Sequence, residues 1–369
     1  MKVKNKILKN HSEKHVNKHY LEKHSEKKHL KKISESHHDK HLKKYSKTHD
    51  SKNYDDVRKA IRDIEEQMSK IVVGQKKIIR GIIRAILCDG HVLVEGVPGT
   101  AKTLIVRSIA KILGCGMKRV QFTVDLLPTD ITGITTYIPK KGFEVIKGPI
   151  FANFILADEI NRSPPKTQSA LLEAMQEKEV TISKKSYPLP LPFFVMATQN
   201  PVETSGVYNL PEAQIDRFLF KLLIDYPDFE EEKGILGKNI TLQKFDSFKL
   251  KEVLDPEKII ALQEKVKGVF TSDTIKEYII QIVGETRKKD FEKSNYISYG
   301  ASPRASIALF IASKAEALMN GRDYVIPSDV VTVSYPILRH RIILNYEAEA
   351  EKVSIDHIIK HIIDKVKIP

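Results

Sequence analysis

One stretch limits the possible folds more than any other: a glycine-bearing loop, Gly96–Thr103, stands between an apolar run and a helical pattern. The preceding residues, His91–Glu95, are mostly apolar and predict a buried strand. Apolar residues at helical spacing over Leu104–Leu113 predict a helix. Strand, loop and helix in this order are the context of a phosphate-binding loop. The stretch therefore predicts an α/β fold with a parallel sheet flanked by helices.

The residue types in this loop suit the binding of a triphosphate. Glycines let backbone N–H groups turn toward phosphate oxygens, and the following helix presents the positive end of its dipole. Lys102 can reach the β- and γ-phosphates, and the Thr103 hydroxyl can bind Mg²⁺. We assign nine consecutive residues to ATP binding: Gly96, Val97, Pro98, Gly99, Thr100, Ala101, Lys102, Thr103 and Leu104.

Ala101 departs from the general pattern, which has a glycine at this position. Alanine is tolerated there if the residue begins the helix with right-handed backbone dihedrals. The alternative for the whole stretch is an accidental Gly-Pro-Gly turn followed by an ordinary lysine. The flanking strand and helix favour the phosphate-binding loop.

Two later apolar strands end in polar residues of the kind that act beside a bound phosphate. Phe154–Ala157 leads into Asp158 and Glu159, and Phe193–Gln199 leads into Asn200. Asp158 can hold Mg²⁺, Glu159 can polarise the attacking water, and Asn200 can orient that water or contact the γ-phosphate. The alternatives are a helix entry for the two carboxylates and an asparagine that caps a turn before the next proline.

Other segments complete the α/β part. Two amphipathic helices are predicted before the first strand, and from chain order we place Val73 and Gly74, which lie between them, near the adenine. The run Pro128–Gly133 predicts a turn. Strands and hairpin arms are expected over Arg119–Phe122, Ile134–Tyr137, Phe143–Ile146, Val180–Ser183, Tyr187–Pro192 and Leu219–Ile224.

Residues beyond 226 are predicted to be helical, because apolar residues recur there at helical spacing. The expected helices are Asp255–Val266, Ser272–Arg287, Ser302–Asn320, Pro327–Leu344 and Ser354–Val366. We therefore divide the chain into a tail (1–52), an α/β nucleotide-binding domain (53–226) and an all-α lid domain (227–369).

The basic character of the chain is concentrated in its tail. The formal net charge is +14, and residues 1–50 alone hold 15 lysines against six acidic residues. This low-complexity segment, with nine of the 13 histidines, is predicted to be disordered. Its alternatives are a weak metal site formed by His11, His15 and His19, and a cationic segment that lies on nucleic acid or an anionic membrane.

Cys88 and Cys115 lack metal-ligand spacing, so we expect buried free thiols in a reducing compartment. No uncharged apolar stretch is long enough to span a bilayer, and the N-terminus lacks the apolar region of a secretory signal. We therefore expect a cytoplasmic protein without a transmembrane segment.

Several motifs in this order resemble the MoxR family of AAA+ ATPases, in the magnesium chelatase-like, helix-2-insert branch. The resemblance runs from about residue 54 to the C-terminus and leaves the tail outside. It rests on Gly96–Thr103, Gln121–Gly133, Leu156–Arg162, Pro165–Glu177, Ala197–Pro201, Leu210–Phe218 and Gly300–Arg304. Alanine at position 101 is usual in that family.

The resemblance implies a role for each polar residue. Lys102 and Thr103 match Walker A, and Asp158 and Glu159 match Walker B. Asn200 is similar to sensor 1, Arg304 to sensor 2, and Arg217 to the arginine finger that acts on a neighbouring subunit's nucleotide. From the residues alone, Arg217 has an alternative as an ion-pair partner of Asp216. Arg304 begins a helix, from which we expect it to swing onto the γ-phosphate as the lid closes.

The implied activity is ATP hydrolysis with Mg²⁺ by a homo-oligomer, a hexameric ring in the family. Its implied role is chaperone-like remodelling, or cofactor insertion and maturation, of client proteins, often with a von Willebrand factor A-domain partner. A nucleic-acid motor or loader is one alternative, supported weakly by the basic tail but by no recognisable DNA-reading module. A non-hydrolysing nucleotide-dependent scaffold is another, and the intact acidic and arginine positions argue against it.

Overall fold

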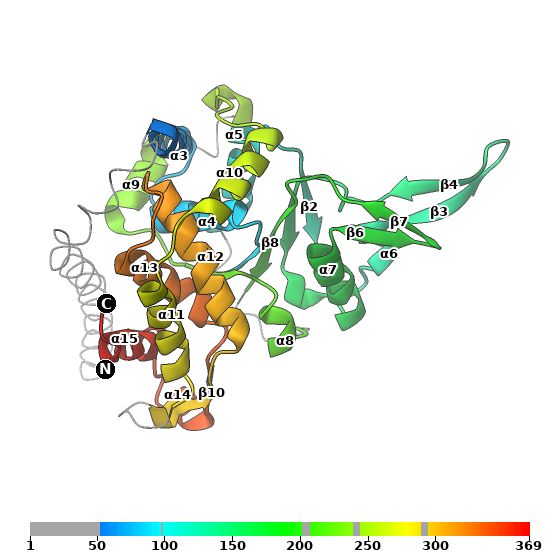
Figure 1. Ribbon diagram of the computed structural model, residues 1–369. Coiled ribbons are helices and arrows are strands. Elements are labelled where there is room, and N and C mark those ends of the chain that lie inside the picture. The colour runs from blue at the N-terminus through cyan, green and yellow to red at the C-terminus, as the bar shows by residue number, and fades with distance from the viewer. Residues whose placement is uncertain (1–51, 97–98, 201–206, 239–243, 289–293) are drawn as a thin grey trace, which may run out of the picture.

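The computed structural model describes residues 52–96, 99–200, 207–238, 244–288 and 294–369 (Figure 1). The predictions for the tail up to residue 51, and for Val97 and Pro98 of the loop, lie outside these residues. Within them, a parallel sheet forms the centre of the α/β part, and helices from the C-terminal half gather on one side of it.

The central sheet has five strands in the order β2-β5-β8-β1-β9, and all neighbouring pairs are parallel. The strands are β1 (Val92–Gly96), β2 (Met117–Gln121), β5 (Phe154–Asp158), β8 (Phe194–Gln199) and β9 (Phe220–Ile224). Each predicted strand of this sheet is confirmed to within two residues at either end. The order places the loop strand β1 between β8 and β9, with β5 on the far side of β8.

Alternate side chains of the sheet enter two hydrophobic cores, as a parallel sheet covered on both faces requires. Val92 and Val94 of β1 pack in one core with α3 (Lys52–Ile71), α4 (Lys76–Leu87) and α5 (Lys102–Ile112). Leu93 packs in the other core with α7 (Pro165–Glu177). The predicted helix pair before β1 is thereby confirmed as the cover of one face.

The C-terminal part is mainly helical, as predicted. Its helices are α9 (Phe229–Lys238), α10 (Pro256–Gly268), α11 (Asp273–Glu285), α12 (Pro303–Met319), α13 (Pro327–Leu338), α14 (Tyr346–Ala350) and α15 (Ile355–Lys365). Of these, α10, α11, α12, α13 and α15 share the first core with α3, α4 and α5. Short 3₁₀ turns lie at Ile160–Arg162, Phe245–Phe248 and Ser294–Tyr296. None of the helices in the described ranges is long and apolar enough to cross a bilayer.

Two local predictions were wrong. The helix expected over Pro327–Leu344 ends at Leu338, because Ile343–Leu344 (β11) pairs instead with Ile297–Tyr299 (β10) in a two-stranded antiparallel sheet. The turn expected over Pro128–Gly133 is the one-turn helix α6 (Pro128–Thr132), in which the Asp130 side chain accepts the N–H of Leu127. In addition, Cys88 and Cys115 are free, as expected, but only partly buried.

A buried ion pair fastens α12 to α4. The Arg84 guanidinium donates Nε and Nη2 to Glu316 Oε2 at 2.9 and 2.5 Å, and both side chains are less than one-tenth exposed. Arg80 adds a longer pair to Glu316 at 3.6 Å. The division at residue 226 stays a prediction, because the first core continues across it.

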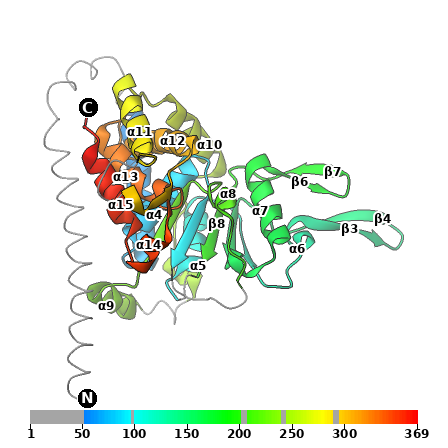
Figure 2. The same cartoon turned by 90° about the horizontal axis from the view of Figure 1, so that it is seen from below.

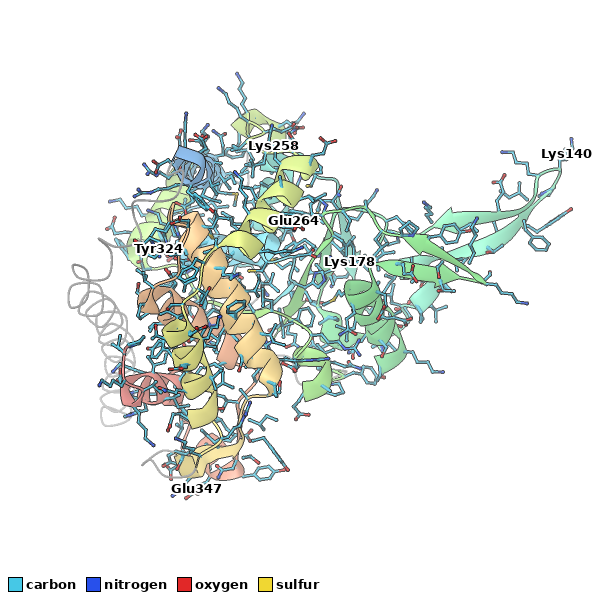
Figure 3. The ribbon with its side chains drawn as sticks, viewed as in Figure 1. Lys140, Lys178, Lys258, Glu264, Tyr324 and Glu347 are labelled. Carbon is cyan, nitrogen blue, oxygen red and sulfur yellow. The ribbon has the colours of Figure 1, made fainter. Side chains whose placement is uncertain are left out.

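Two hairpins project from the face that α7 covers (Figures 1 and 2). One is formed by β3 (Gly133–Ile138) and β4 (Gly142–Lys147), the other by β6 (Glu179–Ile182) and β7 (Lys185–Pro188), and both are confirmed as predicted hairpins. The hydroxyls of Thr135 and Ser183, 2.9 Å apart, join them. Figure 3 shows Lys140 at the outer end of the first hairpin, far from the sheet.

Candidate active site

The carboxyl ends of β1, β8 and β5 lie side by side at one edge of the sheet, because these strands are parallel neighbours. This edge brings together the loop after Gly96, the Asp158–Glu159 pair after β5 and Asn200 after β8. Three segments far apart in the sequence thus meet where a ligand binds an open α/β sheet.

Within the loop, the Lys102 side chain folds back onto the backbone at Gly96. Lys102 begins α5, and its ammonium donates to the Gly96 carbonyl oxygen at 2.5 Å. Gly96 is the last residue of β1, and a Cβ there would lie 2.8 Å from the Ile224 carbonyl oxygen, so only glycine fits against β9. Gly99 has φ +84°, a conformation that glycine adopts at little cost.

Ala101 does not meet the condition of right-handed dihedrals under which alanine was expected to be tolerated. Ala101 has φ 60° and ψ 20°, in the left-handed region, and stands directly before the first residue of α5. A left-handed residue costs about 1–2 kcal/mol when it carries a Cβ. Alanine is therefore accommodated by local strain at the point where the loop enters the helix, and not by a helical conformation.

Lys102 lies within the electrostatic field of the Asp158 and Glu159 carboxylates. Partial burial lowers the pKa of Lys102, and the charges of Asp158 and Glu159 act in the opposite direction. Because the two carboxylates influence the ammonium, Lys102, Asp158 and Glu159 belong to one cluster of charges.

Asp158 is held by two neighbours that the sequence did not reveal. The Thr198 hydroxyl donates to Oδ1 at 2.6 Å, and Arg119 donates Nε and Nη2 to Oδ2 at 3.1 and 2.7 Å. Arg119 lies on β2, next to β5 in the sheet. Sequence alone could have found these residues only if the strand order had been known.

Glu159 is held in a similar way. Its Oε2 accepts the Gln121 amide at 2.8 Å and the Arg162 guanidinium at 3.0 Å. Its backbone has φ 57°, just after the end of β5, and its N–H donates to the Thr198 hydroxyl at 2.8 Å. Thr198 therefore contacts both acidic residues and fixes their relative position.

Thr103 and Asp158 supply the donor types that Mg²⁺ prefers, a hydroxyl and a carboxylate. The described part of the chain contains no cluster of three or more His, Cys, Asp or Glu residues that could hold a metal alone. Mg²⁺ keeps several waters and takes phosphate oxygens as ligands, so a two-residue protein contribution fits it. The residues present therefore fit the ion.

Val73 and Gly74 lie at the same edge and are covered by α9. Gly74 has φ +68°, and a Cβ there would clash with the Glu231 carboxylate, while a Cβ on Gly234 would lie 2.9 Å from Val73 Cγ1. The neighbouring Gln75 amide donates to the Asp225 carbonyl oxygen, directly after β9, at 3.4 Å. Their assignment to the adenine stays a prediction.

Arg217 and Arg304 lie at the opposite edge. Arg217 precedes β9, whose first residue, Phe220, pairs with the first residue of β1. Its Nη1 donates to the Leu172 carbonyl oxygen at 3.4 Å, and it lines a cavity of about 320 Å³ against α7. Arg304 Nη1 lies 3.6 Å from Asp216 Oδ2. The expected movement of Arg304 onto the γ-phosphate when the lid closes stays a prediction.

The comparisons with known proteins agree with this arrangement. Residues 91–220 match the ATPase family associated with various cellular activities (AAA), and residues 291–362 match an AAA lid domain. Chaperone MoxR1 of Mycobacterium tuberculosis is 44% identical over 309 residues, covering 82% of this chain and 81% of that protein. The chain belongs to the MoxR family of AAA+ ATPases. It is thus an enzyme that hydrolyses ATP.

Two further relatives extend the comparison. The uncharacterized protein YeaC of Bacillus subtilis is 47% identical over 305 residues, covering 82% of this chain and 93% of that protein. A crystal structure of a protein from Cytophaga hutchinsonii, assigned as an ATPase, has a TM-score of 0.80 at 46% identity and covers 86% of this chain and 97% of that one. The predicted family, fold class and enzyme activity are confirmed.

Proposed function

We propose that this MoxR-family ATPase works as a homo-oligomeric ring, hexameric by its resemblance, that cleaves ATP between adjacent copies and remodels client proteins. The observation that supports it is the division of the site between two edges of one sheet. Lys102 and Glu159 lie at the carboxyl edge, whereas Arg217 lies at the amino edge, about 13 Å of strand away. A head-to-tail contact in a closed ring brings the two edges of neighbouring copies together.

In this arrangement, Lys102 leaves the Gly96 carbonyl and binds the β- and γ-phosphates, together with the backbone N–H groups of the loop. Glu159 orients the attacking water and accepts its proton, and Asn200, buried at the end of β8, orients the same water or contacts the γ-phosphate. Thr103 and Asp158 would hold Mg²⁺, which supplies charge neutralisation for the phosphates.

Arg217 of the neighbouring copy completes the site. A guanidinium stabilises the negative charge that spreads over the transferred phosphoryl group, and an arginine finger contributes about 10³–10⁵ in rate. Arg304 lies at the same edge, so it would also act on the neighbour's nucleotide unless the lid moves.

The β3–β4 hairpin supports the client role. Tyr137 and Phe143 face each other across the strands with ring centroids 5.4 Å apart, and their exposures are 62% and 79%. Lys140 and Lys141 form the turn between them. An exposed aromatic pair beside lysines suits contact with another polypeptide. The two free thiols support a cytoplasmic location.

Two variants test the shared site. We expect Glu159→Gln to bind ATP but to stall, and Arg217→Ala to bind ATP with almost unchanged affinity but to lose at least 100-fold in kcat. Mixed in equal amounts, the two inactive variants should regain about a quarter of wild-type activity, since about half of the Arg217→Ala sites then receive a finger from a Glu159→Gln neighbour. A fully active monomer, or no recovery in the mixture, would refute the shared site.

The client role has its own test. ATP-loaded Glu159→Gln protein is used to capture bound proteins from the source cells, and mass spectrometry identifies them. We expect to capture client proteins, and a von Willebrand factor A-domain protein among them. Their capture should be lost when Tyr137 and Phe143 are replaced. Salt-sensitive stimulation of ATP hydrolysis by DNA would instead favour a nucleic-acid motor, and the absence of phosphate release would favour a scaffold.

A further inference from the structure

The lid forms hydrogen bonds with the backbone on both sides of Arg217. Arg341 follows α13, is 8% exposed and donates five hydrogen bonds. One, from Nη1, joins it to the Ile337 carbonyl oxygen of its own helix at 2.8 Å. The other four reach the Arg217 segment: Asp216 Oδ1 at 2.7 Å, and the carbonyl oxygens of Asp216, Phe218 and Leu219 at 3.2, 2.9 and 3.2 Å.

Asp216 connects these hydrogen bonds to a second lid helix, α12. While Oδ1 accepts from Arg341, Oδ2 faces Arg304 Nη1 at 3.6 Å and accepts the Ser302 hydroxyl at 3.4 Å, both at the start of α12. A single carboxylate next to Arg217 therefore contacts both α12 and α13. His340 strengthens the attachment, since its Nε2 donates to the Phe218 carbonyl oxygen at 3.0 Å.

Arg217 itself has little to hold it in place. Its side chain is exposed and donates a long hydrogen bond, 3.4 Å, to the Leu172 carbonyl oxygen. Its position relative to a neighbouring copy is therefore set by its backbone. That backbone is attached to the lid through Arg341 and Asp216.

We propose that the Arg341–Asp216 ion pair is a joint through which the lid of one copy positions Arg217, and so sets the ATP turnover of the neighbouring copy. Arg341 and Asp216 are positioning residues that touch no substrate. A movement of α12 or α13 pulls on both side chains and shifts Arg217 with them. The inference rests on the proposed function, in which Arg217 acts on the neighbour.

The test uses the full chain with Arg341→Gln, and with Asp216→Asn as a milder variant. We expect the affinity for a fluorescent ATP analogue, measured with Mg²⁺, to change less than about twofold, because the Lys102 site is intact. We expect kcat to fall at least tenfold, because the neighbour's Arg217 is displaced. Mixing with Glu159→Gln protein should restore activity to about a quarter of wild type, the share of interfaces that pair an intact site with an intact finger.

Arg339→Gln is the matched control. Arg339 stands two residues before Arg341, but its guanidinium pairs with Asp356 on α15 at 2.6 Å, and it reaches the strand segment only at the Lys221 carbonyl oxygen, at 3.4 Å. This variant should keep kcat within about twofold of wild type. A tenfold loss in Arg339→Gln as well would show that general loosening of the lid, not the joint, slows turnover.

The outcomes separate this inference from the proposed function. If the Arg217→Ala mixture recovers activity and the Arg341→Gln and Asp216→Asn mixtures do not, the joint is refuted and the shared site stands. If ATP affinity falls as much as kcat, the joint is refuted too. If the Arg217→Ala mixture does not recover activity, both the joint and the shared site are refuted. Thermal unfolding is measured for each variant, and if Arg341→Gln does not fold, Asp216→Asn decides.

Discussion

Both carboxylates at the end of β5 are engaged by donors from neighbouring elements. Arg119 holds Asp158, and Arg162 and Gln121 hold Glu159. A charge-assisted hydrogen bond must be given up or shared before a carboxylate oxygen can serve a metal ion or a water molecule. If Asp158 holds Mg²⁺ as proposed, Arg119 would compete with the ion for this carboxylate.

Arg119→Gln tests this competition. Arg119 is half-exposed, so its pair with Asp158 is worth no more than about 1 kcal/mol, and its loss should lower the Mg²⁺ concentration for half-maximal ATP hydrolysis about two- to fivefold. A magnesium titration at saturating ATP measures the effect. An unchanged or higher magnesium requirement would show that Arg119 does not oppose the metal.

His91, at the start of β1, makes stability depend on pH. It is buried, its Nε2 donates to the Met175 carbonyl oxygen at 3.0 Å, and its Nδ1 accepts the Val195 N–H at 3.1 Å. Burial lowers the pKa of His91 from 6.5 to about 4. Between these values the unfolded chain binds the proton and the folded chain does not, so stability falls as the pH falls.

From pH 7 to pH 5, we expect His91 to remove about 2 kcal/mol from the free energy of unfolding. Burial also lowers the pKa of His340, so its effect has the same sign. Urea denaturation at several pH values measures the change, and His91→Gln should flatten the curve. An equal slope in that variant would assign the pH dependence to other groups.

At the scale of elements, α4 and α12 are joined by charges inside the core. Glu316 accepts two hydrogen bonds from Arg84, and the Asn320 amide also donates to it. Burial raises the pKa of Glu316, but the charge of Arg84, followed by Arg80 and hydrogen bonds from Arg84 and Asn320, outweighs it and holds the pKa below its usual value. The carboxylate therefore stays ionised and fastens α12 to the α/β part.

Glu316→Ala should lower the free energy of unfolding by about 3–5 kcal/mol, because it leaves the Arg84 charge buried without its partner. The double variant Arg84→Met with Glu316→Leu should recover most of this loss, since two apolar side chains of similar volume can replace a buried pair. Urea unfolding of the three proteins gives the comparison. A double variant that is as unstable as Glu316→Ala, or less stable, would contradict the interpretation.

At the scale of the whole molecule, one copy presents the nucleotide site at one edge of the sheet and Arg217 at the other. A single copy cannot assemble the two, so activity should depend on association. We expect the turnover per chain to fall at least tenfold when the protein is diluted below the concentration at which it dissociates. Phosphate release and light scattering, measured on the same samples, test this, and a constant turnover across dissociation would contradict it.

The sequence by itself determined the local features of this ATPase. The Gly96–Thr103 loop, the strands that end at Asp158 and Asn200 and the amphipathic helices all follow from short-range patterns, because hydrophobic period and loop chemistry are written in consecutive residues. The two hairpins were predicted on the same basis.

Only the tertiary structure decided which distant residues meet. Strand order placed Arg119 beside Asp158 and separated Arg217 from Lys102, and a sequence does not display strand order. The early end of α13 and the attachment of Arg341 to Asp216 depend on contacts between segments far apart in the chain. Such contacts depend on packing of the whole molecule, which overrides local preference wherever the two disagree.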